Sequence, residues 1–208
     1  MTLRCGSVEL DASLPAALRQ ALCGADRAPA SVAGRATRGA AQFRLRQTRD
    51  GLELMALMEP ALGTLRVDLL HGSAGWRSGV RARSERLVRA CGVLRGEKAP
   101  LIIDGTGGLG TDSWLLASAG ATVVTCERQP VLAALLRDGV ERAASATPDV
   151  AARVRILEGD VRGYLDALEA DVLYLDPMYP QRRKSALGDR RLRFLAALFA
   201  ARDAIGSA

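Results

Sequence analysis

Apolar positions follow two different patterns along the chain. Up to about residue 70, short alternating runs dominate: "QFRLRQT" and "LELMALM" flank Asp50-Gly51, a pair typical of a hairpin turn, and "GTLRVDLL" follows as a third run. Residues 14–23 have the spacing of a helix. We therefore predict that the chain begins with a small antiparallel β module that includes a leading helix.

From residue 99 onward, runs of strand length alternate with helical segments. The runs "APLIID", "ATVVTCE", "RVRILEGD" and "DVLYLD" indicate four strands, each followed by a helical segment. This βαβα order predicts an α/β fold with a parallel, Rossmann-like sheet. The expected domains are an N-terminal α+β module with a basic connector over residues 1–95 and a Rossmann-like domain over residues 96–208.

Composition narrows the function classes. The 208 residues carry a formal net charge of +6, which favours an anionic partner, nucleic acid first. The four cysteines are far apart and His71 is the only histidine, so we expect no metal site and no His-based catalytic triad. No apolar run approaches the length of a membrane span, and no signal-peptide pattern opens the chain. We expect a cytoplasmic protein with no membrane partner.

A glycine-rich loop joins the first strand of the second half to its helix. "IIDGTGGLGTDSW" places G-x-G-x-x-G at Gly105, Gly107 and Gly110, between a strand and a helix as nucleotide binding requires. A simple tight turn is the alternative, and both dinucleotides and S-adenosylmethionine use this geometry. Charge favours S-adenosylmethionine, because Asp104 and Asp112 beside the loop repel a pyrophosphate but attract an ammonium and a sulfonium.

Acids also end the next two strands. Glu127 lies 22 residues after Gly105, where an acid can accept both ribose hydroxyls of an adenosine, in NAD enzymes as well as in methyltransferases. Asp160 ends the third strand, where it can bond the adenine amino group or shape its pocket. An ordinary solvated acid is the alternative for Glu127. These residues predict a cofactor site at the carboxyl edge of the sheet.

The fourth strand ends in a proline-flanked acid. Asp176-Pro177-Met178-Tyr179 resembles the (D/N)-P-P-(Y/F) motif of amino-group methyltransferases, with methionine in place of the second proline. The Asp176 carboxylate and the Pro177 carbonyl can accept hydrogen bonds from an exocyclic amine and aim its lone pair, while Tyr179 can stack on the base. A proline-rich turn is the alternative. The candidate RNA-phosphate ligands that follow this motif are Arg182, Arg183 and Lys184.

Three segments carry a resemblance to a known family. "DGTGGLGTDSWLLASAG", "ERQPVLAALLRDG" and "YLDPMYPQRRKSAL" closely resemble the RsmJ family of bacterial small-subunit ribosomal RNA guanine-N2 methyltransferases, over about residues 52–200. The resemblance implies a class I S-adenosylmethionine-dependent methyltransferase that makes N2-methylguanosine in 16S rRNA or the small ribosomal subunit. The cofactor contacts that the resemblance implies are Thr111, Asp112, Glu127, Arg128, Asp160, Val161 and Asp176.

The sequence also departs from the family pattern. The connector "GWRSGVRARSE" is basic but lacks most of the family's glycines and its histidine. A class I sheet has strand order 3-2-1-4-5-7-6, so this chain would supply 3-2-1-4, and "VLYL" would lie on an uncovered edge of a C-terminally incomplete sheet.

Two other functions remain open from the sequence. A nicotinamide-dependent oxidoreductase could use the same glycine loop, although no obvious proton donor lies near the expected cleft. A non-catalytic RNA-binding relic of the methyltransferase is the other alternative.

Overall fold

The computed structural model describes residues 3–5, 7–25, 42–72, 75, 78, 82–94, 98–177 and 190–206. The chain divides into two compact units. The first unit comprises Met1–Arg66 and Tyr179–Ala208, and the second unit comprises Val67–Met178. Within the described ranges, no helix is both long enough and apolar enough to span a membrane.

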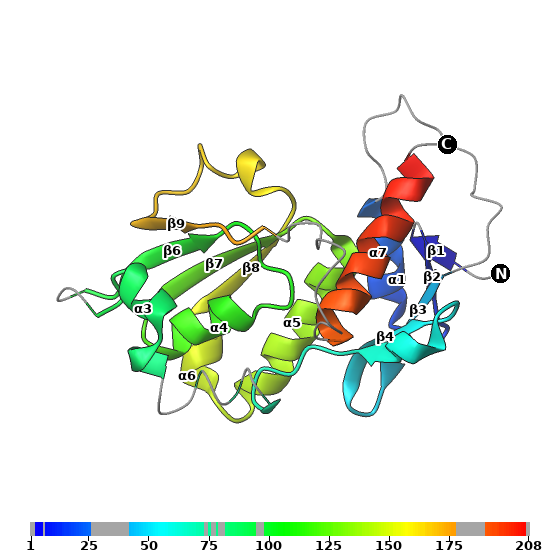
Figure 1. The fold of residues 1–208 in the computed structure, drawn as a ribbon, viewed down its shortest axis with the longest axis horizontal. Coiled ribbons are helices and arrows are strands. Elements are labelled where there is room, and N and C mark those ends of the chain that lie inside the picture. The colour runs from blue at the N-terminus through cyan, green and yellow to red at the C-terminus, as the bar shows by residue number, and fades with distance from the viewer. Residues whose placement is uncertain are drawn as a thin grey trace, which may run out of the picture. The chain divides into compact units, whose positions relative to one another are not determined.

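A four-stranded parallel sheet is the centre of the second unit (Figure 1). In chain order its strands are β6 (Leu101–Asp104), β7 (Thr122–Glu127), β8 (Val154–Glu158) and β9 (Val172–Tyr174). In space they lie in the order β8-β7-β6-β9, which is the predicted 3-2-1-4. The Rossmann-like prediction is therefore confirmed. The chain reverses its direction of travel at β6, and ligands of such sheets bind beside this reversal.

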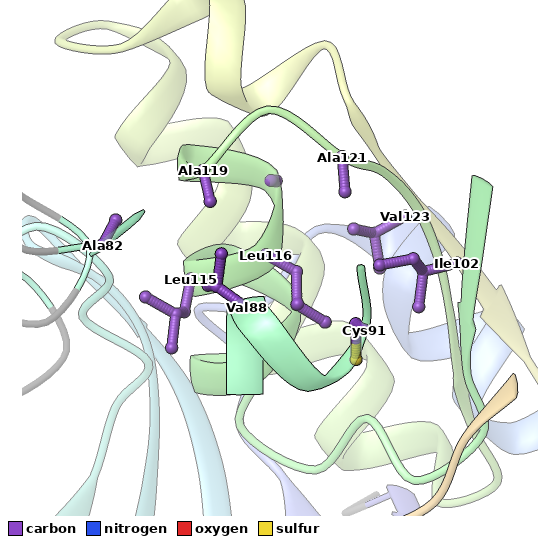
Figure 2. Close-up of a cluster of buried hydrophobic side chains, with 10 residues drawn as sticks. Ala82, Val88, Cys91, Ile102, Leu115, Leu116, Ala119, Ala121 and Val123 are labelled. Carbon is purple, nitrogen blue, oxygen red and sulfur yellow. The ribbon is translucent and has the colours of Figure 1, made fainter. Parts of the chain in front are cut away.

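Helices cover one face of this sheet. They are α3 (Arg86–Ala90), α4 (Thr111–Ser118), α5 (Pro130–Ala144) and α6 (Pro148–Ala151), and a 3₁₀ turn, η2 (Ala82–Ser84), precedes them. Because β6, β7 and β8 follow one another across the sheet, right-handed crossovers place α4 and α5 on the same face. Figure 2 shows Val88 and Cys91 with Leu116 of α4, facing Ile102 and Val123 of the strands in one buried cluster.

The opposite face has a smaller core. Ile103 and Val124 follow Ile102 and Val123 directly, so their side chains point to the other side of the pleated sheet. There they form a buried cluster with Cys126, against which Val161, Tyr164 and Leu168 pack. The helical segment predicted after the third strand run is only the 3₁₀ turn η3 (Val161–Gly163).

The first unit is built on a five-stranded sheet in the order β1-β2-β3-β4-β5. Its strands are β1 (Leu3–Cys5), β2 (Val8–Leu10), β3 (Phe43–Thr48), β4 (Gly51–Ala56) and β5 (Thr64–Leu65). Its helices are α1 (Ala16–Ala25), η1 (Pro60–Leu62) and α7 (Arg190–Gly206). The predicted hairpin is present as β3 and β4. The sheet is mixed and not purely antiparallel, because β2 pairs with β3 in parallel.

The compact units do not coincide with the two segments predicted from the sequence. The segment around Val88, expected in the N-terminal module, packs into the core of the second unit. The last helix, expected beside the parallel sheet, belongs to the first unit, where the ring of Phe194 lies 5.4 Å from that of Phe43. An amphipathic pattern shows that a helix buries a face but does not identify the surface that covers it.

The β9 edge of the parallel sheet is exposed in the described part of the chain. The exposed fractions of Leu173 and Leu175 are 46% and 51%. The prediction that this strand lies at the edge of the sheet is confirmed by the strand order.

Backbone conformation favours glycine at both position 110 and position 92, and close packing requires it at position 110 as well. Both adopt positive φ, 72° and 69°, but a Cβ on Gly110 would lie 2.2 Å from Leu136 Cδ1, whereas a Cβ on Gly92 would meet no atom within 4 Å. We expect Gly92→Ala to lower the free energy of unfolding by ~1 kcal/mol through backbone strain. Gly110→Ala should cost ~1–3 kcal/mol more because it also overpacks the core. Urea unfolding measures the free energy of unfolding of both variants. Equal losses of stability would contradict the predicted overlap of a Cβ at position 110 with Leu136.

Candidate active site

The glycine-rich loop after β6 is hydrogen-bonded to both neighbouring strands. Gly105 N–H donates to the Tyr174 carbonyl of β9 at 3.0 Å, and Gly107 N–H donates to the Cys126 carbonyl of β7 at 3.0 Å. A Cβ on Gly105 would lie 2.6 Å from Leu175, and a Cβ on Gly107 would lie 2.5 Å from Thr125. A Cβ on Gly107 would also lie 3.0 Å from the Cys126 carbonyl oxygen, so the close approach of the loop to β7 requires glycine there. The loop is therefore held at the carboxyl edge of the sheet, where the three strands end.

Asp104 is the most deeply buried acid of the site. It is 2% exposed, its Oδ2 accepts the Ser113 hydroxyl at 2.5 Å, and its Oδ1 accepts Thr106 N–H at 3.0 Å. Thr125 in turn donates to the Ser113 hydroxyl at 2.7 Å. Burial raises the pKa of Asp104, and the hydrogen bond from Ser113 opposes this effect. Asp104 thus joins the end of β6 to its own loop and to α4, and a direct cofactor contact stays a prediction.

Glu127 ends β7 and fixes the backbone on both sides of the site. Its Oε2 accepts Gly108 N–H at 2.7 Å, and its Oε1 accepts Gln129 N–H at 2.7 Å, just before α5 begins. It is 7% exposed. Burial raises its pKa, and the two backbone hydrogen bonds oppose the rise. Each oxygen keeps a further lone pair, so the predicted ribose contact is compatible with this geometry.

Asp112 lies in the first turn of α4, next to the predicted Thr111, and is connected to β9. The hydroxyl of Tyr174 donates to Asp112 Oδ2 at 2.9 Å. Burial, followed by this hydrogen bond, raises the pKa of Tyr174. Our sequence reasoning missed Tyr174. The available signal was strand alternation, since Tyr174 lies two residues before Asp176 and so shares a side of the strand with it.

Asp160 is hydrogen-bonded to Arg162, a partner that we did not predict from the sequence. It caps η3, where its Oδ1 accepts Arg162 N–H at 3.0 Å and its Oδ2 lies 2.7 Å from Arg162 Nη2. The hydrogen bonds from Arg162 lower the pKa of Asp160. Val161, the next residue, lies beside the loop, since a Cβ on Gly105 would lie 3.0 Å from its side chain. The cofactor contact predicted for Val161 is compatible with this position beside the loop.

The proline-flanked acid lies beside the glycine loop. Asp176 and Pro177 are exposed, and Asp176 N–H donates to the Thr106 hydroxyl at 2.8 Å. The structure thus brings the ends of β6, β7 and β9 to one loop, as the sequence predicted for a Rossmann-like sheet. The predicted residues that lie outside the described residues are Tyr179, Arg182, Arg183 and Lys184.

Comparison with known proteins places the chain in a family. The sequence model of a family described as putative SAM-dependent methyltransferases matches residues 32–204. The chain belongs to this family. The fold agrees: a crystal structure of a SAM-dependent methyltransferase from Neisseria gonorrhoeae matches with a TM-score of 0.60 and 28% sequence identity, over 83% of this chain and 69% of that one.

Curated relatives carry a more specific name. Ribosomal RNA small subunit methyltransferase J from Thioalkalivibrio sulfidiphilus is 43% identical over 155 residues, which cover 71% of this chain and 60% of that protein. The protein of the same name from Colwellia psychrerythraea is 40% identical over 161 residues, covering 76% and 59%. These similarities confirm the resemblance seen in the three motifs. The chain spans about 60% of the length of these relatives.

The buried carboxyl of Asp104 predicts a specific pH dependence of stability. Because burial raises its pKa above the unfolded value, Asp104 stabilises the fold when protonated, and this contribution is lost as pH rises through the raised pKa. Asn at this position cannot ionise. We therefore expect the free energy of unfolding of the wild type, minus that of Asp104→Asn, to fall as the pH rises from ~4, the unfolded-state pKa of aspartate, through the raised pKa of Asp104; urea titrations at a series of pH values measure this difference.

The matched control is Asp166→Asn, which removes one carboxylate at an exposed position. A difference between wild type and Asp104→Asn that rises with pH would contradict the burial of an ionisable Asp104.

Proposed function

We propose that this protein transfers a methyl group from S-adenosylmethionine to the exocyclic N2 amine of a guanosine in small-subunit ribosomal RNA. The observation that carries the proposal is the convergence of three acids on one glycine-rich loop: Asp104 at the end of β6, Glu127 at the end of β7, and Asp176 two residues after β9. Family membership supports the methyl donor, and the names of the curated relatives support the RNA.

The residues of the loop fit a cationic cofactor. Carboxyl groups surround the loop: Asp104 and Glu127 are buried beside it, and Asp112 lies in the first turn of α4. A pyrophosphate would meet these carboxylates unfavourably, whereas an ammonium and a sulfonium are stabilised by them. Bound S-adenosylmethionine supplies a methyl group activated by its sulfonium. The residues proposed to hold it are Asp104, Gly105, Gly107, Gly110, Thr111, Asp112, Glu127, Arg128, Asp160, Val161 and Asp176.

Asp176 is proposed to position the acceptor amine. Its exposed carboxylate and the adjacent Pro177 carbonyl are acceptors that a base amine can reach from solvent. Hydrogen bonds to both N–H groups localise the nitrogen lone pair and orient it, and orientation is the main contribution that an enzyme makes to such a transfer. Tyr179 is proposed to stack on the base, and Arg182, Arg183 and Lys184 to bind neighbouring phosphates.

The net charge and the names of the relatives support the proposal of an RNA substrate. A formal charge of +6 favours binding to a polyanion. The relatives are named for methylation of small-subunit ribosomal RNA, and we extend this substrate to the present chain. The guanine N2 atom, the action of this chain on 16S rRNA and a cytoplasmic location are parts of the same proposal.

Cofactor choice can be tested by thermal unfolding with two ligands. S-adenosylhomocysteine at about 100 times its dissociation constant should add ~2.7 kcal/mol to the stability and raise Tm by several degrees, because it binds only the folded protein. NADH at equal concentration should leave Tm unchanged. Stabilisation by NADH without stabilisation by S-adenosylhomocysteine would instead support the oxidoreductase alternative.

Removal of the Asp176 carboxylate should abolish the transfer. We expect Asp176→Ala to lower the rate of methyl incorporation into 16S rRNA by ~10²-fold or more, because the principal acceptor for the amine is lost. Incorporation of labelled methyl groups, followed by mass spectrometry of the nucleosides for N2-methylguanosine, measures this rate.

Asp166→Ala, which removes an exposed acid elsewhere in the second unit, is the matched control. Near-wild-type turnover by Asp176→Ala would refute the assigned role. Cofactor binding by the wild type without any methyl transfer to 16S rRNA or small subunits would favour the RNA-binding relic.

A further inference from the structure

The end of β9 is attached to the glycine loop by one main-chain hydrogen bond and one hydrogen bond to a side chain. β6 and β9 pair in parallel, with Asp104 opposite Tyr174. The ladder continues for one step beyond this pair, since Gly105 N–H donates to the Tyr174 carbonyl. In a regular parallel ladder, the following N–H of β9 would donate to a main-chain carbonyl of the loop. Here the N–H of Asp176 donates to the side-chain hydroxyl of Thr106 at 2.8 Å.

The direction of this hydrogen bond determines where the hydroxyl proton of Thr106 points. A backbone N–H can only donate, so Thr106 Oγ1 must accept from Asp176, and its own proton is left for another acceptor. Asp104 Oδ1 lies 3.4 Å from Thr106 Oγ1 and also accepts Thr106 N–H. The buried carboxylate therefore orients the hydroxyl so that a lone pair faces the Asp176 N–H.

This connection reaches a rigid part of the fold. Asp104 is held by Ser113 of α4, and Ser113 by Thr125 of β7, all three of them buried. Asp176 itself is exposed, so burial of its side chain contributes little to its position. Threonine is β-branched, which restricts χ1 and makes its hydroxyl a stiff support.

We propose that Thr106 is the positioning residue that fixes Asp176 for methyl transfer. The proposal rests on the proposed function for the task of Asp176. Thr106 does not react itself. Its hydroxyl holds the amide nitrogen of Asp176, which is bonded to the Asp176 Cα. It thereby fixes the backbone from which the Asp176 carboxylate and the Pro177 carbonyl extend. Small displacements of such groups are costly for a reaction that depends on orientation.

Exchange of the Asp176 amide hydrogen tests the anchor without any catalysis. In ¹⁵N-labelled protein, we expect the Asp176 N–H of Thr106→Val to exchange with solvent about tenfold faster than in the wild type, since valine keeps the shape but has no acceptor. Thr106→Ser should retain slow exchange. Thr122→Val, the same substitution at an exposed position of β7, should not change it. Unchanged exchange in Thr106→Val would overturn the proposal.

Kinetics test whether the anchor serves the reaction. We expect Thr106→Val to lower kcat for methylation of 16S rRNA about tenfold and to leave the affinity for S-adenosylhomocysteine unchanged, because Thr106 N–H still donates to Asp104. Thr106→Ser should restore kcat. If exchange accelerates while kcat stays at the wild-type value, or if cofactor affinity falls in parallel with kcat, Thr106 is not a positioning residue for Asp176.

A second variant and the activity of the wild type make the results for Thr106→Val interpretable. Thr106→Ala removes the same hydroxyl with a smaller side chain and replaces valine if Thr106→Val does not fold. If the wild type itself transfers no methyl group, both the proposed function and the positioning role of Thr106 are rejected. If the wild type is active and Thr106→Val is equally active, only the positioning role is rejected.

Discussion

The buried carboxylate of Asp104 is the constraint on which the site depends. A desolvated acid at the end of a central strand is costly unless hydrogen bonds satisfy it. Ser113 and the Thr106 main chain supply these bonds, and they fix the start of α4 and the first turn of the loop relative to β6. The same requirement therefore stabilises the acid and builds the place where we propose that the cofactor binds.

The glycines of the loop serve packing as much as ligand binding. Gly105 and Gly107 let the loop approach β9 and β7 so closely that a methyl group would overlap Leu175 or Thr125, and Gly110 does the same against Leu136 of α5. Glu127 then bonds the loop from the β7 side. A G-x-G-x-x-G pattern in this chain is thus explained by contacts within the protein, while the charges around it indicate the kind of ligand.

Several parts of the structure were predictable because they depend on local pattern. The helix over residues 130–144 begins at a proline, as predicted. The hairpin follows from the alternating residues on either side of Asp50, although its two turn residues are Arg49 and Asp50, one position before the predicted Asp50-Gly51 pair. Strand alternation places Tyr174 on the same side as Asp176, but the hydrogen bonds that Thr106 and Tyr174 make were not predictable from local pattern. Each bonds a residue about 60 to 70 positions away, and only the pairing of β6 with β9 brings these partners together.

The sequence by itself determined the βαβ rhythm, the acids at the strand ends and the glycine loop, since each is a property of neighbouring residues. Tertiary structure decided which strands became neighbours in the first sheet, where β2 and β3 pair in parallel across more than thirty intervening residues. It also decided that α7 packs with Phe43 and that the segment around Val88 packs under the parallel sheet. The reason is physical: an apolar face must be buried, but the surface that buries it is selected by the whole fold.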